Sequence, residues 1–188
     1  MLPILLGEKM TDIHYCYITE QYYEDHPNLE KILDIDDSTK HNIRTHLCLN
    51  IKFKHNNVLI PLRKNLGDEV RKFGRIGHSV ASASKPKAGL DYRYIMIIND
   101  VNYLRFDTPR ISNSQIRIIQ NDYEDIEKEA IEYIKSYIKK ANKGRVELTS
   151  RFKESSLINF HKELGVVEQN NEVIIITQIQ DLGKDATS

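Results

Sequence analysis

Residues 43–62 constrain the fold most, because they carry the pattern of a β-hairpin. Apolar and polar residues alternate over residues 43–53, polar residues at 55–57 supply turn chemistry, and apolar residues resume at 58–62. Alternate side chains of a strand point to opposite faces, so the pattern predicts two half-buried strands joined by a tight turn. Pro61 lacks the N–H that a ladder needs, which predicts that the second strand lies near an edge or an end.

Helical periodicity predicts most of the remaining regular structure. Thr19 is expected to cap a helix over residues 20–26, and residues 28–33 are expected to add a turn or two. Residues 122–140 place isoleucine, alanine and tyrosine side chains on one face and Glu and Lys on the other, as in an amphipathic helix. A last helix is expected over residues 155–164.

Short apolar runs predict further strands at residues 94–98, 101–104, 116–119 and 173–179. The fold class is therefore expected to be α+β, a compact sheet with peripheral helices. With 188 residues and 40% hydrophobic content, the chain is long enough for one compact core and short for two. We expect one domain over residues 10–182, an N-terminal extension over residues 1–9 because Met10 offers a second start, and a disordered tail over residues 183–188.

The N-terminal residues and the cysteines are the sequence features from which a cellular compartment can be predicted. The apolar run at residues 1–6 is interrupted by Pro3, and it is too short for a signal-peptide core or a membrane span. A cytoplasmic protein without a membrane partner is expected. Cys16 and Cys48 lack CxxC spacing and a partner cluster, so they suggest neither a zinc site nor a disulfide, and both are expected to be reduced and buried. No metal or cofactor is expected.

Charge is distributed unevenly along a chain whose net charge is zero. Residues 40–93 hold twelve Lys and Arg against three acids, a local net charge of +9, whereas residues 1–39 have a net charge of −7. A basic segment of this size is typical of proteins that bind a phosphate backbone. The alternative is a solvated face paired with the acidic N-terminal residues.

The basic segment contains a long interruption of regular structure, from Arg63 to Arg93. Connections between elements usually have about 4–6 residues, so a much longer one is either disordered or functional. Its basic, Ser-rich and His-containing composition favours function.

The motifs of this region resemble those of a known toxin group. They are Ile60-Pro61-Leu62-Arg63-Lys64-Asn65-Leu66, Gly77-His78-Ser79, Lys85-Pro86-Lys87-Ala88-Gly89-Leu90-Asp91-Tyr92-Arg93-Tyr94 and Ile97-Ile98-Asn99-Asp100. With the opening Tyr17-Ile18-Thr19 and the late amphipathic helices, they resemble the ribonucleases of type III toxin–antitoxin systems, the ToxN/AbiQ group, and more closely its CptN and TenpN relatives. The resemblance spans about residues 10–165, although its motifs cover only the middle third.

This resemblance implies a compact, strongly bent antiparallel sheet or barrel of the MazF/Kid type. It also implies RNA cleavage that leaves a 2′,3′-cyclic phosphate, and inhibition by a small repeated RNA pseudoknot in a closed heteromeric ring. The chain departs from the ToxN pattern in which Thr-Ser-x-Lys follows the Pro-Leu strand, because Arg63-Lys64-Asn65 stand there. Only Arg63 and Lys64 are therefore carried over, as basic groups.

Metal-free RNA cleavage needs groups that take the 2′-OH proton, protonate the leaving 5′-oxygen and hold charge on the phosphorus. The predicted catalytic residues, which have these chemistries, are Arg63, His78, Ser79, Lys85 and Asp91. The predicted RNA-binding residues are Lys52, Lys54, Lys64, Arg71, Lys72, Arg75, Lys87 and Arg93. A structural role stays open for His78, whose ring can form internal hydrogen bonds, and for Asp91, whose carboxylate can cap a turn.

The sequence thus favours a metal-independent endoribonuclease toxin that acts on RNA, including its antitoxin precursor. Two alternatives stay open. One is a non-catalytic RNA-binding module that uses the same basic residues for phosphates, and the other is a MazF-like ribonuclease restrained by a protein antitoxin.

Overall fold

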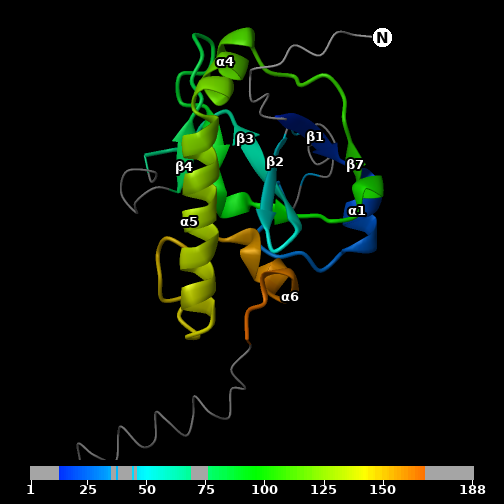
Figure 1. The fold of residues 1–188 in the computed structure, drawn as a ribbon, viewed down its shortest axis with the longest axis vertical. Helices are drawn as coiled ribbons and strands as arrows, with labels where there is room; N and C mark the ends of the chain where they lie inside the picture. Colours follow the sequence, from blue (N-terminus) through cyan, green and yellow to red (C-terminus); the bar gives the residue numbers. More distant parts are fainter. Residues whose placement is uncertain (1–12, 35–36, 38–43, 45, 69–75, 168–188) are drawn as a thin grey trace, which may run out of the picture.

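The computed structural model describes residues 13–34, 37, 44, 46–68 and 76–167, with only the backbone of residues 46–52. Seven strands of this part of the chain form one antiparallel sheet (Figure 1). They are β1 (His14–Ile18), β2 (His46–Phe53), β3 (Asn56–Arg63), β4 (Gly77–Ser79), β5 (Gly89–Asp91), β6 (Met96–Ile97) and β7 (Leu104–Arg105). Their order is β4-β5-β3-β2-β1-β7, with β6 beside β3. Because this order has two ends, the described strands do not close into a barrel, and the expected α+β class is confirmed without one.

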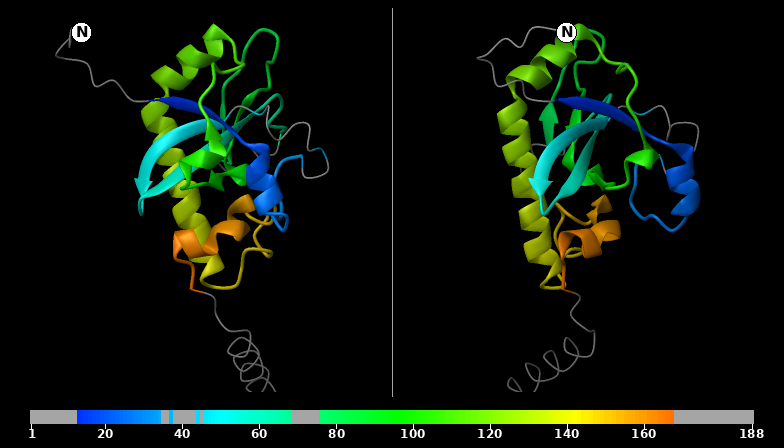
Figure 2. Two further views of the ribbon diagram at one scale, coloured as in Figure 1. Left: turned by 90° about the vertical axis from the view of Figure 1, so that its right-hand side faces the viewer. Right: turned by 45° about the vertical axis from the view of Figure 1, so that its right-hand side comes forward.

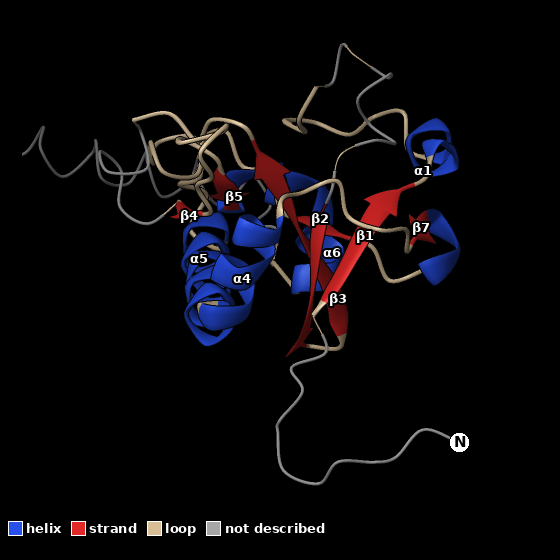
Figure 3. Ribbon diagram, turned by 90° about the horizontal axis from the view of Figure 1, so that it is seen from above, coloured by secondary structure: helices blue, strands red, loops and turns tan. Residues whose placement is uncertain are grey.

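The helices pack around this sheet on different sides. They are α1 (Glu20–Asp25), α4 (Asn113–Asn121), α5 (Tyr123–Ala141) and α6 (His161–Leu164), with short 3-10 turns η1 (Tyr92–Tyr94), η2 (Val101–Tyr103) and η3 (Ser156–Phe160). Viewed from above, α4 and α5 lie on one side of the strands and α1 on the other, beside β7 (Figure 3). Within the described residues, no helix combines the length and the apolar composition needed to cross a lipid bilayer.

Helix α5 confirms the amphipathic helix predicted from the sequence. Its Ile126, Ala130, Tyr133, Ile134 and Tyr137 are fully buried, because residues three and four apart fall on one face of a helix. Figure 2 shows this helix standing alongside the curved β2–β3 hairpin. Burial of each large side chain contributes about 1.5–3 kcal/mol, so this face anchors α5 to the sheet.

The predicted β2–β3 hairpin is confirmed, with its turn slightly earlier than expected. Phe53 pairs with Asn56, so the turn residues are Lys54 and His55. Both have positive φ, 53° and 67°, which is the backbone that a two-residue hairpin turn requires. Asn56 therefore belongs to β3, where its side chain donates to the Phe53 carbonyl oxygen at 3.1 Å.

Pro61 does not mark an edge strand, because β3 has partners on both sides. It pairs with β2 along one side, and on the other with β6 at Val58 and Leu59 and with β5 at Leu62 and Arg63. Pro61 lies between these two short ladders, where its missing N–H removes no bond to β5 or β6. The residue thus marks the point at which β3 changes partner.

Residues 116–119, predicted as a strand, belong to α4. The helix begins with a capping box. The Ser112 hydroxyl accepts from the Gln115 backbone N–H, and the Gln115 side-chain oxygen accepts from the Ser112 backbone N–H. This Ser-x-x-Gln signal outweighs the β-propensity of the isoleucines that follow, because it satisfies the first free N–H groups of the helix. The isoleucines of this segment do not alternate with polar residues as a half-buried strand requires. In the helix, Ile119 is buried in the core.

The other predicted elements are confirmed in part. The strands expected at 94–98 and 101–104 shrink to β6 and β7, because Asp91 and Asp100 accept backbone N–H bonds two residues ahead and start η1 and η2. The last helix is split into η3 and α6. Helix α1 follows Thr19 without a side-chain cap bond, and residues 28–33 contain turns and a bend but no helical turn.

Two further expectations concern the chain ends and the cysteines. The extension at 1–9, the tail at 183–188 and the strand at 173–179 lie outside the described residues. Cys16 is buried in β1 as expected but is disulfide-bonded, so the expectation that it is reduced is wrong. Sequence spacing gives no sign of this, because only the register of β1 with β2, in which His14 lies opposite Cys48, brings the backbones of Cys16 and Cys48 near each other.

Candidate functional site

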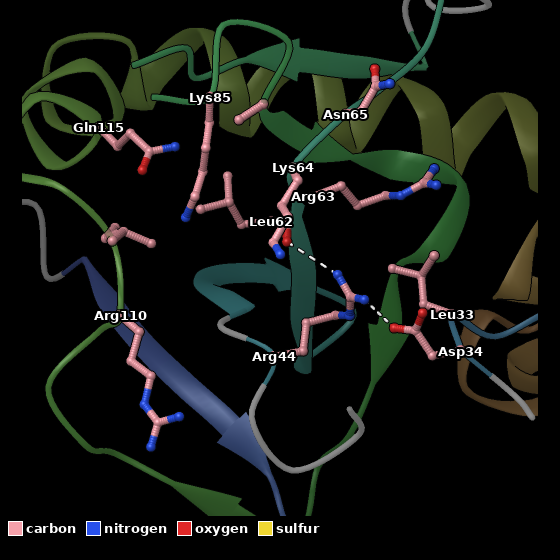
Figure 4. A pocket seen from close by; sticks show the side chains of 12 residues that line it. Leu33, Asp34, Arg44, Leu62, Arg63, Lys64, Asn65, Lys85, Arg110 and Gln115 are labelled. Carbon is pink, nitrogen blue, oxygen red and sulfur yellow. Dashed lines mark hydrogen bonds and ion pairs between the residues drawn. The ribbon is translucent and has the colours of Figure 1, made fainter. Parts of the chain in front are cut away.

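A cationic pocket of about 460 Å³ lies at the end of β3 (Figure 4). Its described lining residues are Leu33, Asp34, Arg44, Leu62, Arg63, Lys64, Asn65, Lys85, Ala88, Arg110, Ile111 and Gln115. Five of these are basic and one is acidic. They come from β3, the β4–β5 hairpin, the start of α4 and the segments that carry Asp34 and Arg44. We call this site the cationic pocket.

The strand ends bring the predicted residues Arg63, Lys64 and Lys85 to this pocket. Arg63 pairs with Gly89 of β5, and the loop between β4 and β5 is closed by two backbone hydrogen bonds between Ser82 and Lys85, at 3.0 and 3.1 Å. A Cβ atom at Gly89 would lie 2.3 Å from the His78 carbonyl oxygen. Only glycine therefore allows the strands to approach closely enough to place Lys85 here.

Lys64 and Lys85 differ from Arg63 in their charge partners. Among the described residues, neither Lys64 nor Lys85 forms an ion pair. Figure 4 shows their ammonium groups reaching into the space in front of β3, whereas the Arg63 guanidinium turns to the other side of the strand. Such a pocket attracts anions and repels metal cations.

Arg44 and Arg110 complete the pocket, although neither was predicted from the sequence as a site residue. Arg44 donates to the Leu62 carbonyl oxygen at 3.3 Å and forms an ion pair with Asp34. Arg110 lies at the far rim, where its backbone N–H donates to the Tyr17 hydroxyl at 3.0 Å. Arg44 stands in the basic segment that the sequence marked, but Arg110 lies outside it and no local motif signals it.

Asp91 is fully buried and binds the two arginines on either side of it. Its carboxylate accepts from Arg63 Nη1 at 2.7 Å, from Arg93 Nε at 2.9 Å and from Arg93 Nη2 at 2.8 Å. It also accepts from the Arg93 backbone N–H at 3.1 Å, so it both orients a basic partner and caps a turn. The buried Arg93, predicted to bind RNA, is directed at Asp91, whereas Arg63 keeps 29% of its side chain exposed.

Tyr94 lies beside both arginines and provides an uncharged ring. The Arg63 and Arg93 guanidinium carbons lie 5.3 and 5.6 Å from its centroid, which is cation–π distance. Burial, and then the Asp91 carboxylate, raise the pKa of the Tyr94 hydroxyl, while Arg93 and Arg63 act in the opposite direction. The phenol therefore stays protonated at neutral pH, so it does not serve as a general base.

His78 lies outside the cationic pocket, in a second group that we call the His78 cluster. Its Nδ1 is 3.1 Å from Glu129 Oε2, and its Nε2 is 3.1 Å from Asp122 Oδ2. Glu129 also accepts from the Tyr92 hydroxyl at 2.8 Å. Both ring nitrogens of His78 are thus engaged by carboxylate oxygens, so these contacts tie β4 to α5 and favour the structural alternative for His78.

The register explains why Arg63 and His78 do not meet. One row across β3, β5 and β4 contains Arg63, Gly89 and Ser79, and the next contains Leu62, Leu90 and His78. Adjacent rows of a sheet point to opposite faces. The side chains of Arg63 and His78 are therefore on opposite faces, whereas Ser79 shares the face of Arg63 at the far edge of the ladder.

The other predicted RNA-binding residues are dispersed. Lys54 donates to the Leu164 carbonyl oxygen at 2.8 Å, at the end of α6, and Lys87 is exposed on the β4–β5 hairpin. The side chain of Lys52 is not described, and Arg71, Lys72 and Arg75 lie outside the described residues. Of the predicted RNA-binding set, the described structure brings only Lys64 into the cationic pocket.

The chain matches no protein-family model, no curated protein and no solved structure. The site is therefore interpreted from its own geometry. In the described residues, no three or more His, Cys, Asp and Glu side chains are grouped so that they could hold a metal ion.

Proposed function

We propose that this chain is a metal-independent endoribonuclease that binds RNA phosphates in the cationic pocket. The observation that carries the proposal is the meeting of Arg44, Arg63, Lys64, Lys85 and Arg110 around one cavity with one described acid, Asp34. Phosphate groups of RNA are abundant anionic ligands for a pocket lined by several basic residues. The resemblance to type III toxins supplies the reaction, and with it the strongly bent MazF/Kid-like form of the sheet.

In the proposed reaction the 2′-oxygen attacks phosphorus, its proton passes to water, and the bond to the 5′-oxygen breaks. We assign Lys85 to protonate that leaving oxygen, because its ammonium group faces the pocket and forms no ion pair with a described residue. Lys64 stabilises the charge that develops on the other phosphate oxygens. Arg63 stays paired with Asp91 at 2.7 Å on the other side of β3, and this pair supports the strand end that carries Lys64.

The test is cleavage of RNA by the purified protein in excess EDTA. Products with 2′,3′-cyclic phosphate ends are expected in EDTA at the same rate as in Mg²⁺. Loss of cleavage on chelation, restored by Mg²⁺ or Mn²⁺, would contradict metal independence, and absence of cleavage in both conditions would contradict catalysis.

A non-catalytic RNA-binding module is the second candidate, and the position of His78 favours it. No histidine is among the described residues that line the pocket, so Lys85 is the candidate proton donor there. Such a module binds RNA with the same salt dependence but releases no products. The cognate inhibitor is proposed to be a small repeat RNA; tandem short repeats upstream of the gene would support it, and a gene for a small protein there would support a protein antitoxin.

A further inference from the structure

An exposed aromatic pair lies at the junction of β1 and β7, away from the hydrophobic core. Phe106, directly after β7, is 56% exposed, and the exposed ring of His14 meets it edge to face, with centroids 6.5 Å apart and planes at 79°. A single exposed aromatic ring is common on protein surfaces. This pair differs from such an isolated ring in the residues that surround it.

The segment that carries Phe106 is held firmly on both sides of the ring. Before it, Arg105 pairs with Tyr17 of β1. After it, the buried Tyr17 hydroxyl donates to the Thr108 carbonyl oxygen at 3.3 Å and accepts from the Arg110 N–H at 3.0 Å. The ring is thus presented on a fixed scaffold, which a recognition surface requires.

The same segment joins the ring to the cationic pocket. Arg105 precedes Phe106 and lies 5.3 Å from the centroid of Tyr17, and Arg110, four residues after Phe106, lines the pocket. Four extended residues span at most about 14 Å, which corresponds to about four nucleotides at ~3.4 Å per nucleotide of a stacked strand. Aromatic rings beside a cationic track are the arrangement by which proteins hold single-stranded nucleic acid.

We propose that Phe106, with His14 behind it, is a stacking subsite for one base of a single-stranded RNA whose backbone occupies the cationic pocket. This inference rests on the proposed function and adds the position at which the RNA strand continues beyond the cationic pocket. Duplex RNA does not fit the subsite, because its bases are stacked on one another and expose no face. Arg105 is paired with Asp107, so it is the cationic pocket at the other end of this segment, with Arg110 in its lining, that favours a polyanion over an apolar protein segment.

The chain contains no tryptophan, so Phe106→Trp introduces a single fluorescent reporter that keeps an aromatic ring. The probes are a single-stranded oligonucleotide with 2′-O-methyl riboses, which cannot be cleaved, its abasic counterpart with the same backbone, and a duplex. We expect the base-bearing strand to quench the fluorescence of Phe106→Trp, and the abasic strand to bind without this quenching.

The matched affinity measurement uses Phe106→Leu, which keeps an apolar side chain but has no π-face. Loss of one stacked base should raise the Kd of the base-bearing strand about 5- to 150-fold, and leave the Kd of the abasic strand unchanged. Leu148→Ala, at another apolar side chain that is 83% exposed, should change neither.

The outcomes separate this inference from the function on which it rests. If Lys85→Ala weakens binding of every strand while Phe106→Leu binds like the parent, the subsite is wrong and the cationic pocket stands. If Phe106→Leu weakens the duplex or the abasic strand as much as the base-bearing strand, stacking is also wrong. If neither Lys85→Ala nor Phe106→Leu changes binding, the proposed function fails together with the subsite.

Discussion

The cationic pocket and the His78 cluster hold their basic groups in opposite ways. In the pocket, Lys64 and Lys85 form no ion pair with a described residue. In the cluster, both ring nitrogens of His78 contact carboxylate oxygens, and only 13% of the side chain is exposed. A charge already paired inside the fold has little left to give a ligand, since the existing contact must be broken first. Lys64 and Lys85, which form no ion pair with a described residue, are therefore more available to a ligand than His78 is.

The comparison predicts its largest effect for Lys85→Ala. Loss of a general acid typically lowers a rate about 10²–10⁴-fold, so single-turnover cleavage at saturating protein should fall by that factor. The thermal midpoint should change little, because Lys85 forms no ion pair with a described residue. Lys139→Ala, which removes an equal charge from the exposed side of α5, is the control. If Lys85→Ala cleaves RNA at the parent rate, the cationic pocket is not the site of catalysis.

The second effect concerns the buried carboxylate that holds Arg63. Asp91→Asn keeps the shape of the side chain but leaves two arginines without their counter-charge. Breaking such a buried pair typically costs about 3–5 kcal/mol, measurable as a lower midpoint of urea unfolding. Asp107→Asn, at an exposed aspartate paired with Arg105, should cost at most about 1 kcal/mol. Equal losses in the two variants would show that burial of Asp91 has no energetic consequence.

A smaller effect, on stability rather than on rate, is expected for His78→Ala. The substitution leaves the buried Glu129 with fewer donors, which should destabilise the fold by about 1–3 kcal/mol. Single-turnover cleavage by the folded protein should stay within a few-fold of the parent rate. His55→Asn, at an exposed histidine in the β2–β3 turn whose positive φ asparagine tolerates, should change neither quantity. A fall in rate of about 10²-fold without loss of stability would restore His78 to the catalytic site and overturn the comparison.

The smallest effect is expected for Lys64→Ala on RNA binding. Removal of one phosphate contact should reduce the slope of log K against log salt by about 0.7–0.9. Binding to a non-cleavable single strand at several salt concentrations measures this slope. A slope equal to that of the parent would place Lys64 outside the RNA contact.

The sequence predicted the elements whose signals are local. The β2–β3 hairpin and helix α5 follow from periodicity, because a period of two or of 3.6 residues reports which face is buried. The strand expected at 116–119 was wrong, although the capping signal that decides it, Ser112 with Gln115, was already present in the sequence. Pro61 was predicted to lie near an edge or an end; it lies near the end of β3 but not at an edge of the sheet, because a sequence does not show that one strand can change partner along its length.

The candidate site could be predicted only in part, for a similar reason. Local composition placed Lys64 and Lys85 in one functional region, and the cationic pocket contains both. The register that turns Arg63 and His78 to opposite faces depends on the pairing of three strands. Arg110 reaches the pocket from outside the basic segment through the Tyr17 contact, which no pattern near Arg110 reveals.

The change of partner at Pro61 has a consequence for how the protein opens. In the described part of the chain, β5 pairs with β3 at Leu62 with Leu90 and at Arg63 with Gly89, whereas β2 and β3 share a longer ladder. Proteins open locally in cooperative units that follow such divisions. We therefore expect amide hydrogens of the hairpin, such as the Val80 N–H bonded to the Ala88 carbonyl oxygen at 2.9 Å, to exchange with solvent through a local opening that leaves the β2–β3 amides protected. Lys85 would then move with the hairpin, and the buried Val80 and Leu90 would leave the hydrophobic core in the same opening.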